Sequence, residues 1–318
     1  MKLSVIIPAY KFSAYIHECL LSVLAQKTTF DFEVLVCNDC SPDNTRDVIR
    51  YLEPAYPQLK VLDNVQNTGL TGSMANLLRA ARGDYIAYLD GDDVALPGKL
   101  QAQVDYLDAN PGCAISYHES DMFDTVTGAR LKWYSKEFYN AGYIPQQADI
   151  SHLIRYGTFL QASSIMFRRH DSLLQALDHG SKVICDYPWH IMNAGFLQGT
   201  LDLIPQVLGR YRVHPNSFCA MTQQSAARRV QVTEELVSAC RLGERFGVDS
   251  DVIQLGVNHQ YFAAALFFLK NLEDDLFLQM IERSAGQPIW FDGRHQQAFE
   301  LRANPDDVRQ FLWGEHAV

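Results

Sequence analysis

Apolar and polar positions fall into two repeating patterns over the first 118 residues of the chain. A continuous apolar run at 3–8 is typical of a strand buried on both faces, and further strands are predicted at 32–37, 60–64, 85–90 and 113–118. Between them, segments with the apolar period of a helix occur at 14–26, 41–52, 71–81 and 97–110. Strand–helix units of this length predict an α/β fold with a mostly parallel sheet flanked by helices.

The pattern changes after residue 120. Strands are predicted at 163–167 and 200–213, a helix at 187–198, and an aromatic, loop-like segment at 133–147. Later predicted elements are all helices, at 223–246, 251–271 and 273–284. The longest apolar stretch, 261–269, is shorter than the roughly 20 residues of a membrane-spanning helix and predicts a buried helix. We therefore expect an α/β domain over residues 1–218 and a helical C-terminal region over residues 219–318.

Composition narrows the class of protein. The chain has 318 residues, of which 47% are hydrophobic and 20% charged, as in ordinary globular proteins. Its net charge of -10 argues against a nucleic acid partner, because phosphate binding needs clustered Lys and Arg. Seven scattered cysteines indicate a reducing, cytoplasmic compartment, and the Cys37–Cys40 pair lacks the second pair of a zinc site. The N-terminal apolar run has no small-residue cleavage site, so no signal peptide is expected.

Candidate functional residues gather where the predicted strands end. Pro8, Ala9 and Tyr10 follow the first strand, and Asp39 follows the second. The later strand ends carry Asn67, Gly69 and the acidic segment 90–93. Since ligands of parallel sheets bind beyond the carboxyl ends of the strands, we expect these residues to form one site.

The acidic segment holds Asp90, Asp92 and Asp93 within four positions, with Gly91 among them. Acids this close repel one another unless a cation lies between them. An Asp-x-Asp pair at a strand end suits Mg²⁺ or Mn²⁺, which prefer oxygen ligands and often bridge to phosphate oxygens. Gly91 permits close approach of a ligand, whereas Asp93 is equally suited to capping the next segment. Taken alone, the segment also fits a polar turn of solvated acids.

Further candidates lie outside that segment. Asp39 can accept a hydrogen bond from a nucleobase or a ribose hydroxyl, and Tyr10 can stack on a base or pack against the following helix. Asp186 precedes a helix among apolar residues that would raise its pKa toward that of a general base, although it also fits a helix N-cap. Arg212 and His214 alternate, so a strand would project both to one side, to hold a phosphate and a metal or to form a solvated edge.

Six motifs together resemble those of the family 2 inverting glycosyltransferases over residues 1–217. In chain order they are VIIPAY, CNDCSPDNT, NTGLTG, RGDYIAYLDGDD, CDYPWHI and YRVH. The resemblance implies a Rossmann-like fold of the GT-A type, one Mn²⁺ or Mg²⁺ ion, and displacement with inversion at the anomeric carbon. It implies a hexosyl- or N-acetylhexosaminyltransferase for surface polysaccharide or glycoconjugate synthesis. The donor would be a nucleoside-diphosphate sugar, with UDP favoured.

The resemblance also implies a role for each motif residue. The residues implied to bind the nucleotide are Pro8, Ala9, Tyr10, Asp39, Asn67, Gly69, Asp90 and Gly91. The first three would line the base pocket, Asp39 would accept from the base, and Asp90 would hold the ribose or a metal-bound water. Asp92 and His214 would be metal ligands, with Arg212 as a diphosphate contact. Asp186 would be the catalytic base, and Asp93 would be structural.

The chain departs from the family pattern in three places. Lys11 replaces the Asn of a common PAYN motif, and NDCS at 38–41 replaces DDGS. Met74 lies near a position where many members have Arg. The basic residues that would compensate at the phosphates are Arg79, Arg82 and Arg212.

Three rival functions fit parts of the same sequence. A haloacid-dehalogenase-like phosphatase would use Asp90 as nucleophile and Asp92 as acid/base, but such enzymes usually carry this motif near the N-terminus. A sugar-phosphate nucleotidyltransferase would need a Gly-rich loop after the first strand, and 8–16 has no Gly. A catalytically inactive sugar-nucleotide-binding protein is opposed by the retention of Asp92 and Asp186.

No motif specifies the acceptor, which could be a glycan, a lipid-linked substrate or a protein. We expect the aromatic segment 133–147 on the acceptor side. The helical region 219–318 is expected to serve homo-oligomerisation, acceptor binding or peripheral membrane association at the inner face of the membrane.

Overall fold

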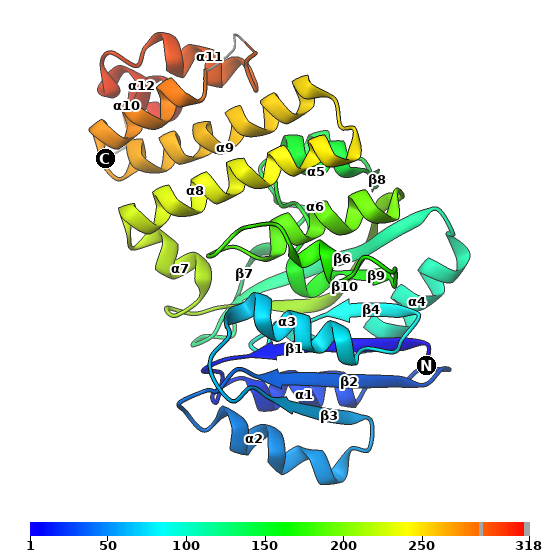
Figure 1. Cartoon of the computed structure of the whole chain (residues 1–318). Helices are drawn as coiled ribbons and strands as arrows, with labels where there is room; N and C mark the ends of the chain where they lie inside the picture. Colours follow the sequence, from blue (N-terminus) through cyan, green and yellow to red (C-terminus); the bar gives the residue numbers. More distant parts are fainter. Residues whose placement is uncertain (286–288, 315–318) are drawn as a thin grey trace. The chain divides into compact units, whose positions relative to one another are not determined.

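The computed structural model describes residues 1–285 and 289–314 (Figure 1). It contains two compact units. The first, which we call the sheet unit, comprises 1–149, 158–178 and 192–214, and the second, the helical unit, comprises 150–157, 179–191 and the chain from 215 onward. The break after His214 lies close to the boundary predicted at residue 218. The helical unit additionally takes two segments from within 1–218, and Asp186 lies in one of them.

All the described strands form a single sheet in the sheet unit. Eight of them follow the order β3-β2-β1-β4-β9-β6-β10-β5, and off this order β7 pairs with β6 and β8 with β10. The first four strands of that order are β3 (Leu59–Asp63), β2 (Phe32–Asn38), β1 (Leu3–Ala9) and β4 (Tyr85–Tyr88). These four pair in parallel, as predicted. Every residue of β1 and β4 is buried, because helices cover both faces of the sheet here.

The other half of the sheet is mixed. Its strands are β9 (Met166–Arg168), β6 (Cys113–Asp124), β10 (Thr200–Val213), β5 (Val94–Ala95), β7 (Arg130–Trp133) and β8 (Gln147–Ala148). The strand β10 runs parallel to β6, but β9 is antiparallel to both of its neighbours, and β5, β7 and β8 pair antiparallel. The predicted parallel pairing is therefore found for β1 to β4 and for β6 with β10, whereas the short strands β5, β7, β8 and β9 add antiparallel pairs. The antiparallel strands have only two to four residues, too few to show a period of two.

Helices flank the sheet in the positions that the apolar periods predict. They are α1 (Ile16–Leu24), α2 (Thr45–Leu52), α3 (Gly69–Ala80) and α4 (Lys99–Ala109). The helix α6 (Asp186–Leu197) is divided between the two units. Short 3₁₀ turns lie at η1 (Glu53–Ala55), η2 (Ala141–Tyr143), η3 (Ala162–Ser164) and η4 (Gln175–Leu177). The apolar face of α1, which includes Ile16 and Leu20, joins residues of β1, β2 and α4 in one core cluster.

The helical unit is built around one long helix. Its elements are α5 (Ile150–Tyr156), the first half of α6, α7 (Phe218–Gln223), α8 (Ala226–Arg241), η5 (Leu242–Phe246), α9 (Ser250–Lys270), α10 (Asp274–Arg283), α11 (Gly293–Glu300) and α12 (Pro305–Trp313). The helix α9 packs against α8, α10 and α5. Gly256 lies against the Ile154 carbonyl, where a Cβ would come within 2.5 Å, so only glycine allows α5 this close. By length and hydropathy α9 could cross a membrane, but 67% of its most apolar window is buried, as in a core helix.

Candidate active site

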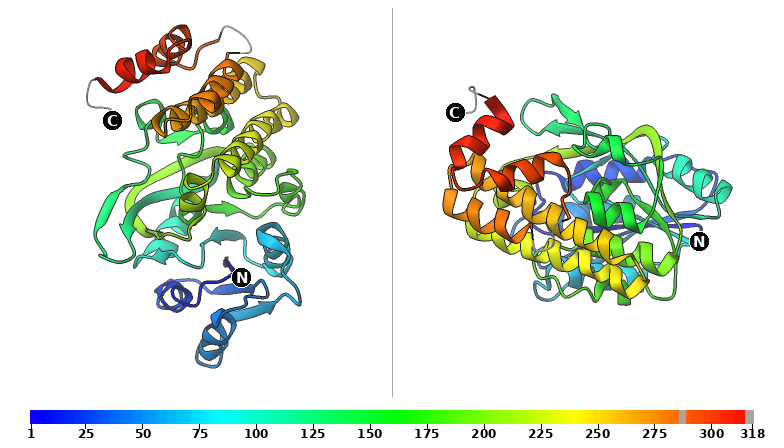
Figure 2. Two further views of the ribbon diagram at one scale, coloured as in Figure 1. Left: turned by 90° about the vertical axis from the view of Figure 1, so that its left-hand side faces the viewer. Right: turned by 90° about the horizontal axis from the view of Figure 1, so that it is seen from above.

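The carboxyl ends of β1, β2 and β4 meet at one edge of the sheet, on the side to which their arrowheads point in Figure 1; Figure 2 gives two further views of the chain. The Asp39 N–H donates to the Ala9 carbonyl at 2.9 Å, which joins the ends of β2 and β1. A Cβ on Gly91 would lie 3.1 Å from the Pro8 carbonyl and 2.8 Å from the Phe12 ring, so the acidic turn touches the end of β1. The structure thus brings the strand-end residues of the sheet unit together, as the sequence predicts.

Asp39 has a buried carboxylate that organises this edge. Its Oδ1 accepts from the Asn64 side chain at 2.8 Å, the Thr68 N–H at 2.8 Å and the Thr68 hydroxyl at 2.9 Å. Its Oδ2 accepts from the Gly69 N–H at 2.8 Å. Burial raises the pKa of Asp39, but these hydrogen bonds outweigh burial and hold the pKa below its ordinary value. A carboxylate oxygen has about two acceptor sites, and Oδ2 accepts one hydrogen bond here, so Oδ2 keeps one site for a further donor such as a base N–H.

Asn67 and Gly69 shape the loop that leads into α3. The Asn67 side chain donates to the Asp39 carbonyl at 3.3 Å and accepts from the Gly69 N–H at 3.2 Å. Gly69 has a φ of 71°, a left-handed conformation that glycine adopts without strain. Both residues therefore position the loop beside Asp39, and their contact with a nucleotide stays a prediction.

The segment predicted to line a base pocket is partly buried and partly exposed to solvent. Pro8 and Ala9 are buried at the end of β1, whereas Tyr10 is 39% exposed and presents its ring for stacking. Lys11, which follows, has a φ of 60°, and Cys40, after Asp39, has a φ of 53°. These are two of the sequence's departures from the family motifs, which place Asn and Gly there. Asn and Gly are the residues that adopt this left-handed conformation most easily.

The acidic turn holds its three carboxylates in different environments. The Tyr88 hydroxyl donates to Asp90 Oδ1, and the Asp90 N–H donates to the Ser163 hydroxyl at 2.8 Å. Asp93 is buried and accepts from the Arg212 N–H and the Gln161 amide, both at 2.9 Å. Burial and the neighbouring Asp92 and Asp90 raise the pKa of Asp93 well above its ordinary value. Asp93 therefore anchors the turn from within, which agrees with the structural role expected for it.

Asp92 meets His214 at the end of β10. The Asp92 Oδ2 and His214 Nε2 atoms lie 2.9 Å apart. The imidazole is buried against the Tyr15 ring, with ring centroids 4.9 Å apart, and its Nδ1 atom has no hydrogen-bond partner among the described residues. The two residues predicted to bind a metal are therefore in contact in the structure.

Arg212 stabilises the Asp92–His214 pair through hydrogen bonds to the backbone of Asp92 and to neighbouring side chains. Its Nε donates to the Asp92 carbonyl at 2.7 Å, its Nη2 to Glu18 at 2.5 Å and its Nη1 to the Thr125 hydroxyl at 3.3 Å. The side chain is only 7% exposed. The sequence suggested a diphosphate contact, but in the structure all three guanidinium nitrogens are directed to protein oxygens. The alternation of residues in a strand gives the side to which a side chain points, not the partners it meets there.

The Asp92–His214 pair fits a Mg²⁺ or Mn²⁺ ion. Octahedral sites with ligand distances of about 2.1 Å place adjacent ligand atoms about 3.0 Å apart, close to the 2.9 Å of the pair. Among the described residues, no group of three or more His, Cys, Asp or Glu could hold a metal. Two protein ligands are nevertheless usual where substrate phosphates and waters complete the shell.

Lys99 and Gln161 are neighbours of the turn that the sequence reasoning missed. The buried Lys99 ammonium donates to the Ser163 carbonyl, and burial lowers the pKa of Lys99 to about 8 even though Asp93 opposes the shift. Its place at the start of α4, after Gly98 with a φ of 87°, carries no local signal that would separate it from a surface lysine.

Asp186 lies at the first residue of α6, in the helical unit. Burial raises the pKa of Asp186 above its ordinary value, while the Tyr187 and Asp186 backbone N–H groups act in the opposite direction. Glu235 fixes the preceding loop by accepting from the Val183 and Ile184 N–H groups, each at 2.9 Å. A raised carboxyl pKa is what a general base needs.

Comparison with known proteins agrees with this geometry. The sequence model described as "Glycosyl transferase family 2" matches residues 4–174, more than half of the chain. The chain spans 60% of the length of the first curated relatives it matches, at 29% identity. It is 39% identical over 101 residues to the UDP-Glc:alpha-D-GlcNAc-diphosphoundecaprenol beta-1,3-glucosyltransferase WfgD of Escherichia coli, covering 32% of this chain and 39% of that protein.

Solved structures show the same fold. TarS 1–349 of S. aureus in complex with UDP-GlcNAc matches with a TM-score of 0.66 at 17% identity, over 89% of this chain and 80% of that one. The mannosyltransferase PcManGT from Pyrobaculum calidifontis, in complex with GDP-Man and Mn²⁺, matches with a TM-score of 0.60 at 15% identity, over 99% and 88% of the chains. The predicted GT-A fold is confirmed. On the match of the sequence model and of its motifs, the chain belongs to glycosyl transferase family 2.

Proposed function

We propose that the chain is a metal-dependent, inverting glycosyltransferase that moves a hexosyl or N-acetylhexosaminyl group from a UDP-sugar to an acceptor hydroxyl. The observation that carries this proposal is the Asp92–His214 pair, 2.9 Å apart beside the strand ends. These two residues would hold Mn²⁺ or Mg²⁺. A divalent cation there would stabilise the negative charge that develops on the departing nucleoside diphosphate.

The nucleotide would lie along the strand ends. Tyr10 offers its exposed ring to the base, and Asp39 Oδ2 keeps an acceptor site for a base N–H. Asp90 is suited to the ribose. The guanidinium of Arg212 is already engaged by protein oxygens, so the divalent cation would make the main contact with the phosphates.

Asp186 would act as the base. The acceptor oxygen attacks the anomeric carbon, the bond from that carbon to the diphosphate oxygen breaks, and the hydroxyl proton passes to the Asp186 carboxylate. One displacement without a protein nucleophile inverts the anomeric configuration. The raised pKa of Asp186 suits it to accept this proton.

Relatives guide the choice of donor and pathway class. WfgD uses UDP-Glc, the TarS complex contains UDP-GlcNAc, and the PcManGT complex contains GDP-Man. Two of the three support a UDP-sugar for this chain. The WfgD acceptor is a diphosphoundecaprenol-linked sugar, which supports a role in polysaccharide synthesis with the enzyme in the cytoplasm, at the inner face of the membrane.

Nucleotide binding tests the proposal directly. Thermal shift with a panel of nucleoside diphosphates should show stabilisation by UDP that requires Mn²⁺ or Mg²⁺. Asp92→Asn should weaken that binding at least tenfold, whereas Asp105→Asn, an exposed acid on α4, should leave it unchanged. Metal-independent UDP binding of equal strength in Asp92→Asn would refute the metal role, and release of phosphate from p-nitrophenyl phosphate would favour a phosphatase.

A further inference from the structure

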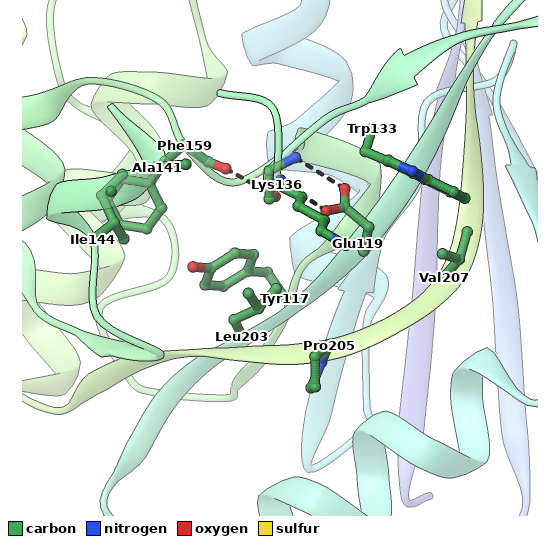
Figure 3. Close-up of a pocket in the computed structure, with 12 residues that line it drawn as sticks. Tyr117, Glu119, Trp133, Lys136, Ala141, Ile144, Phe159, Leu203, Pro205 and Val207 are labelled. Atoms are coloured by element: carbon green, nitrogen blue, oxygen red, sulfur yellow. Dashed lines mark hydrogen bonds between the residues drawn. The ribbon is translucent and has the colours of Figure 1, made fainter. Parts of the chain in front are cut away.

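The sheet unit contains a cavity of about 580 Å³ that the proposed donor site does not use (Figure 3). It lies between the strands β6 and β10 and the segment that follows β7. Its lining residues include Tyr117, Glu119, Trp133, Ile144, Phe159 and Leu203. The volume is within the roughly 300–1,000 Å³ of pockets that bind small molecules. None of the residues assigned to the nucleotide or the metal lines it.

Tyr117 presents an unpaired hydroxyl to this cavity. The side chain is 1% exposed, and its hydroxyl makes no hydrogen bond to any described residue. Figure 3 shows the ring lying across the cavity with the hydroxyl directed toward the side of Ala141 and Ile144. The hydroxyl is free to hydrogen-bond with a ligand in the cavity, which would add to the affinity of that ligand.

Glu119 adds an acceptor on the cavity wall. Its Oε1 accepts from the Ser120 N–H at 2.8 Å and the Ser135 N–H at 2.9 Å. Its Oε2 accepts from the Lys136 N–H at 2.8 Å (Figure 3). Since a carboxylate has about four acceptor sites, Oε2 keeps one for a ligand hydroxyl. Backbone donors fix the carboxylate in place, so it is already oriented before a ligand arrives.

Aromatic rings form much of the remaining wall. The Tyr117 and Phe159 rings pack with centroids 5.7 Å apart, and the Arg130 guanidinium lies 3.8 Å from the Trp133 ring. Sugar rings present C–H faces to such surfaces and carry hydroxyls at their edges. An alkyl chain would leave the Tyr117 hydroxyl unpaired, and the Glu119 carboxylate would repel a phosphate.

Hydrogen bonds connect the cavity to the acidic turn. The Gln161 amide donates to Asp93 at 2.9 Å, and its carbonyl oxygen accepts from the Ser120 hydroxyl at 3.4 Å. Ser120 adjoins Glu119, and Gln161 is two residues from Phe159 in the cavity wall. The cavity thus lies close to the residues that would hold the donor diphosphate, where an acceptor must enter.

We propose that this cavity binds the acceptor by a sugar ring, with Tyr117 and Glu119 hydrogen-bonding its hydroxyls. The role as acceptor site rests on the proposed glycosyltransferase function, whereas the binding of a neutral sugar rests on the cavity alone. The residues 133–147, expected from the sequence on the acceptor side, supply Trp133, Lys136 and Ile144 to the wall.

Glycoside binding to the full chain tests this assignment. The probes are methyl and octyl glycosides of glucose, galactose and N-acetylglucosamine, and their binding is followed by saturation-transfer NMR with UDP and diamagnetic Mg²⁺ present. Tyr117→Phe removes only the hydroxyl and should weaken binding of the preferred glycoside about five- to tenfold. Tyr139→Phe removes a hydroxyl from an exposed tyrosine on the same segment and should change nothing. The affinity for UDP should be the same in wild type and both variants.

Three results would overturn the assignment. The first is equal affinity of wild type and Tyr117→Phe for the glycoside. The second is a loss of UDP affinity in Tyr117→Phe. The third is an affinity for octanol equal to the affinity for octyl glycosides. The last result would identify a site for an apolar chain. If UDP and GDP fail to bind while glycoside binding still depends on Tyr117, the proposed function is refuted and the sugar site stands.

Discussion

Asp92 Oδ2 and His214 Nε2 lie 2.9 Å apart, although 122 residues separate them in the chain. His214 directly follows β10 and lies beside the turn after β4. Arg212, on the same strand, fixes that turn by donating a hydrogen bond to the Asp92 carbonyl. A single strand end thus supplies one member of the pair and fixes the backbone of the other.

Arg212→Lys should weaken metal-dependent UDP binding about tenfold and lower the free energy of unfolding by about 1–3 kcal/mol. A lysine cannot reach the Asp92 carbonyl, Glu18 and Thr125 at once, since it lacks the fork of the guanidinium. Arg210→Lys, two residues away on the same strand, is the matched control and should leave UDP affinity unchanged. Titration calorimetry and urea unfolding measure the two effects. An unaltered UDP affinity in Arg212→Lys would mean that the acidic turn holds its shape without this side chain.

Asp186→Asn should keep UDP binding and lose transfer about 10²- to 10⁴-fold, the usual contribution of a general base. The base must be ionised, and burial raises its pKa, so the wild-type rate should fall as pH drops through a value above the ordinary Asp range. Release of UDP from a UDP-sugar, followed against pH, checks both points. Asp178→Asn, an exposed acid, serves as control. Full activity in Asp186→Asn would rule out its assignment as base.

Glu33 should make the fold acid-sensitive. This buried carboxylate is desolvated, but hydrogen bonds from Lys60, Ser4 and Arg82 outweigh desolvation and lower its pKa from 4.5 to about 2. Because the folded pKa is the lower one, its contribution of up to about 3 kcal/mol is present above pH 4.5 and lost as pH falls toward 2.

Glu33→Gln removes that titration. Urea unfolding of wild type should show the loss of stability between pH 5 and pH 2, and Glu33→Gln should show a smaller pH dependence. Asp105→Asn should retain the wild-type profile. Parallel profiles for wild type and Glu33→Gln would exclude Glu33 as the source.

Cys40→Gly should stabilise the protein by about 1 kcal/mol, because a side chain at a φ of 53° is strained and glycine is not. Cys40→Ala removes the thiol and keeps the strain, so it should not stabilise. Thermal unfolding of the two variants separates the backbone effect from the loss of sulfur. A Cys40→Ala variant as stable as Cys40→Gly would contradict the backbone explanation.

The sequence predicts the helices and strands of the sheet unit well where each element is long enough to show its apolar pattern. The strands β1 to β4 and the helices α1 to α4 lie within a few residues of the predicted ranges, because each has a continuous apolar run or face. The short strands β5, β7 and β8 and the helices α5 and α7 were missed, since two to seven residues carry too few apolar repeats.

The site was predictable where residues follow strand ends, and not where tertiary contacts decide. Asp39 and Asp92 could be named because parallel strands end at one edge. Whether Arg212 faces a ligand or the Asp92 carbonyl depends on its contacts with α1 and with the residue after β6. The apolar pattern of the sequence does not show that these segments lie beside Arg212. Lys99 and Tyr117 were missed for the same reason, because their importance comes from burial.

The thiol of Cys40 gives the protein a natural labelling position. Of the six cysteines whose side chains the structure describes, only Cys40 is exposed, and burial raises the pKa of Cys19, Cys37, Cys113 and Cys240, which slows their alkylation. Cys40 directly follows Asp39, which faces the expected base. A maleimide fluorophore attached there would place a spectroscopic reporter beside the nucleotide without any engineered mutation.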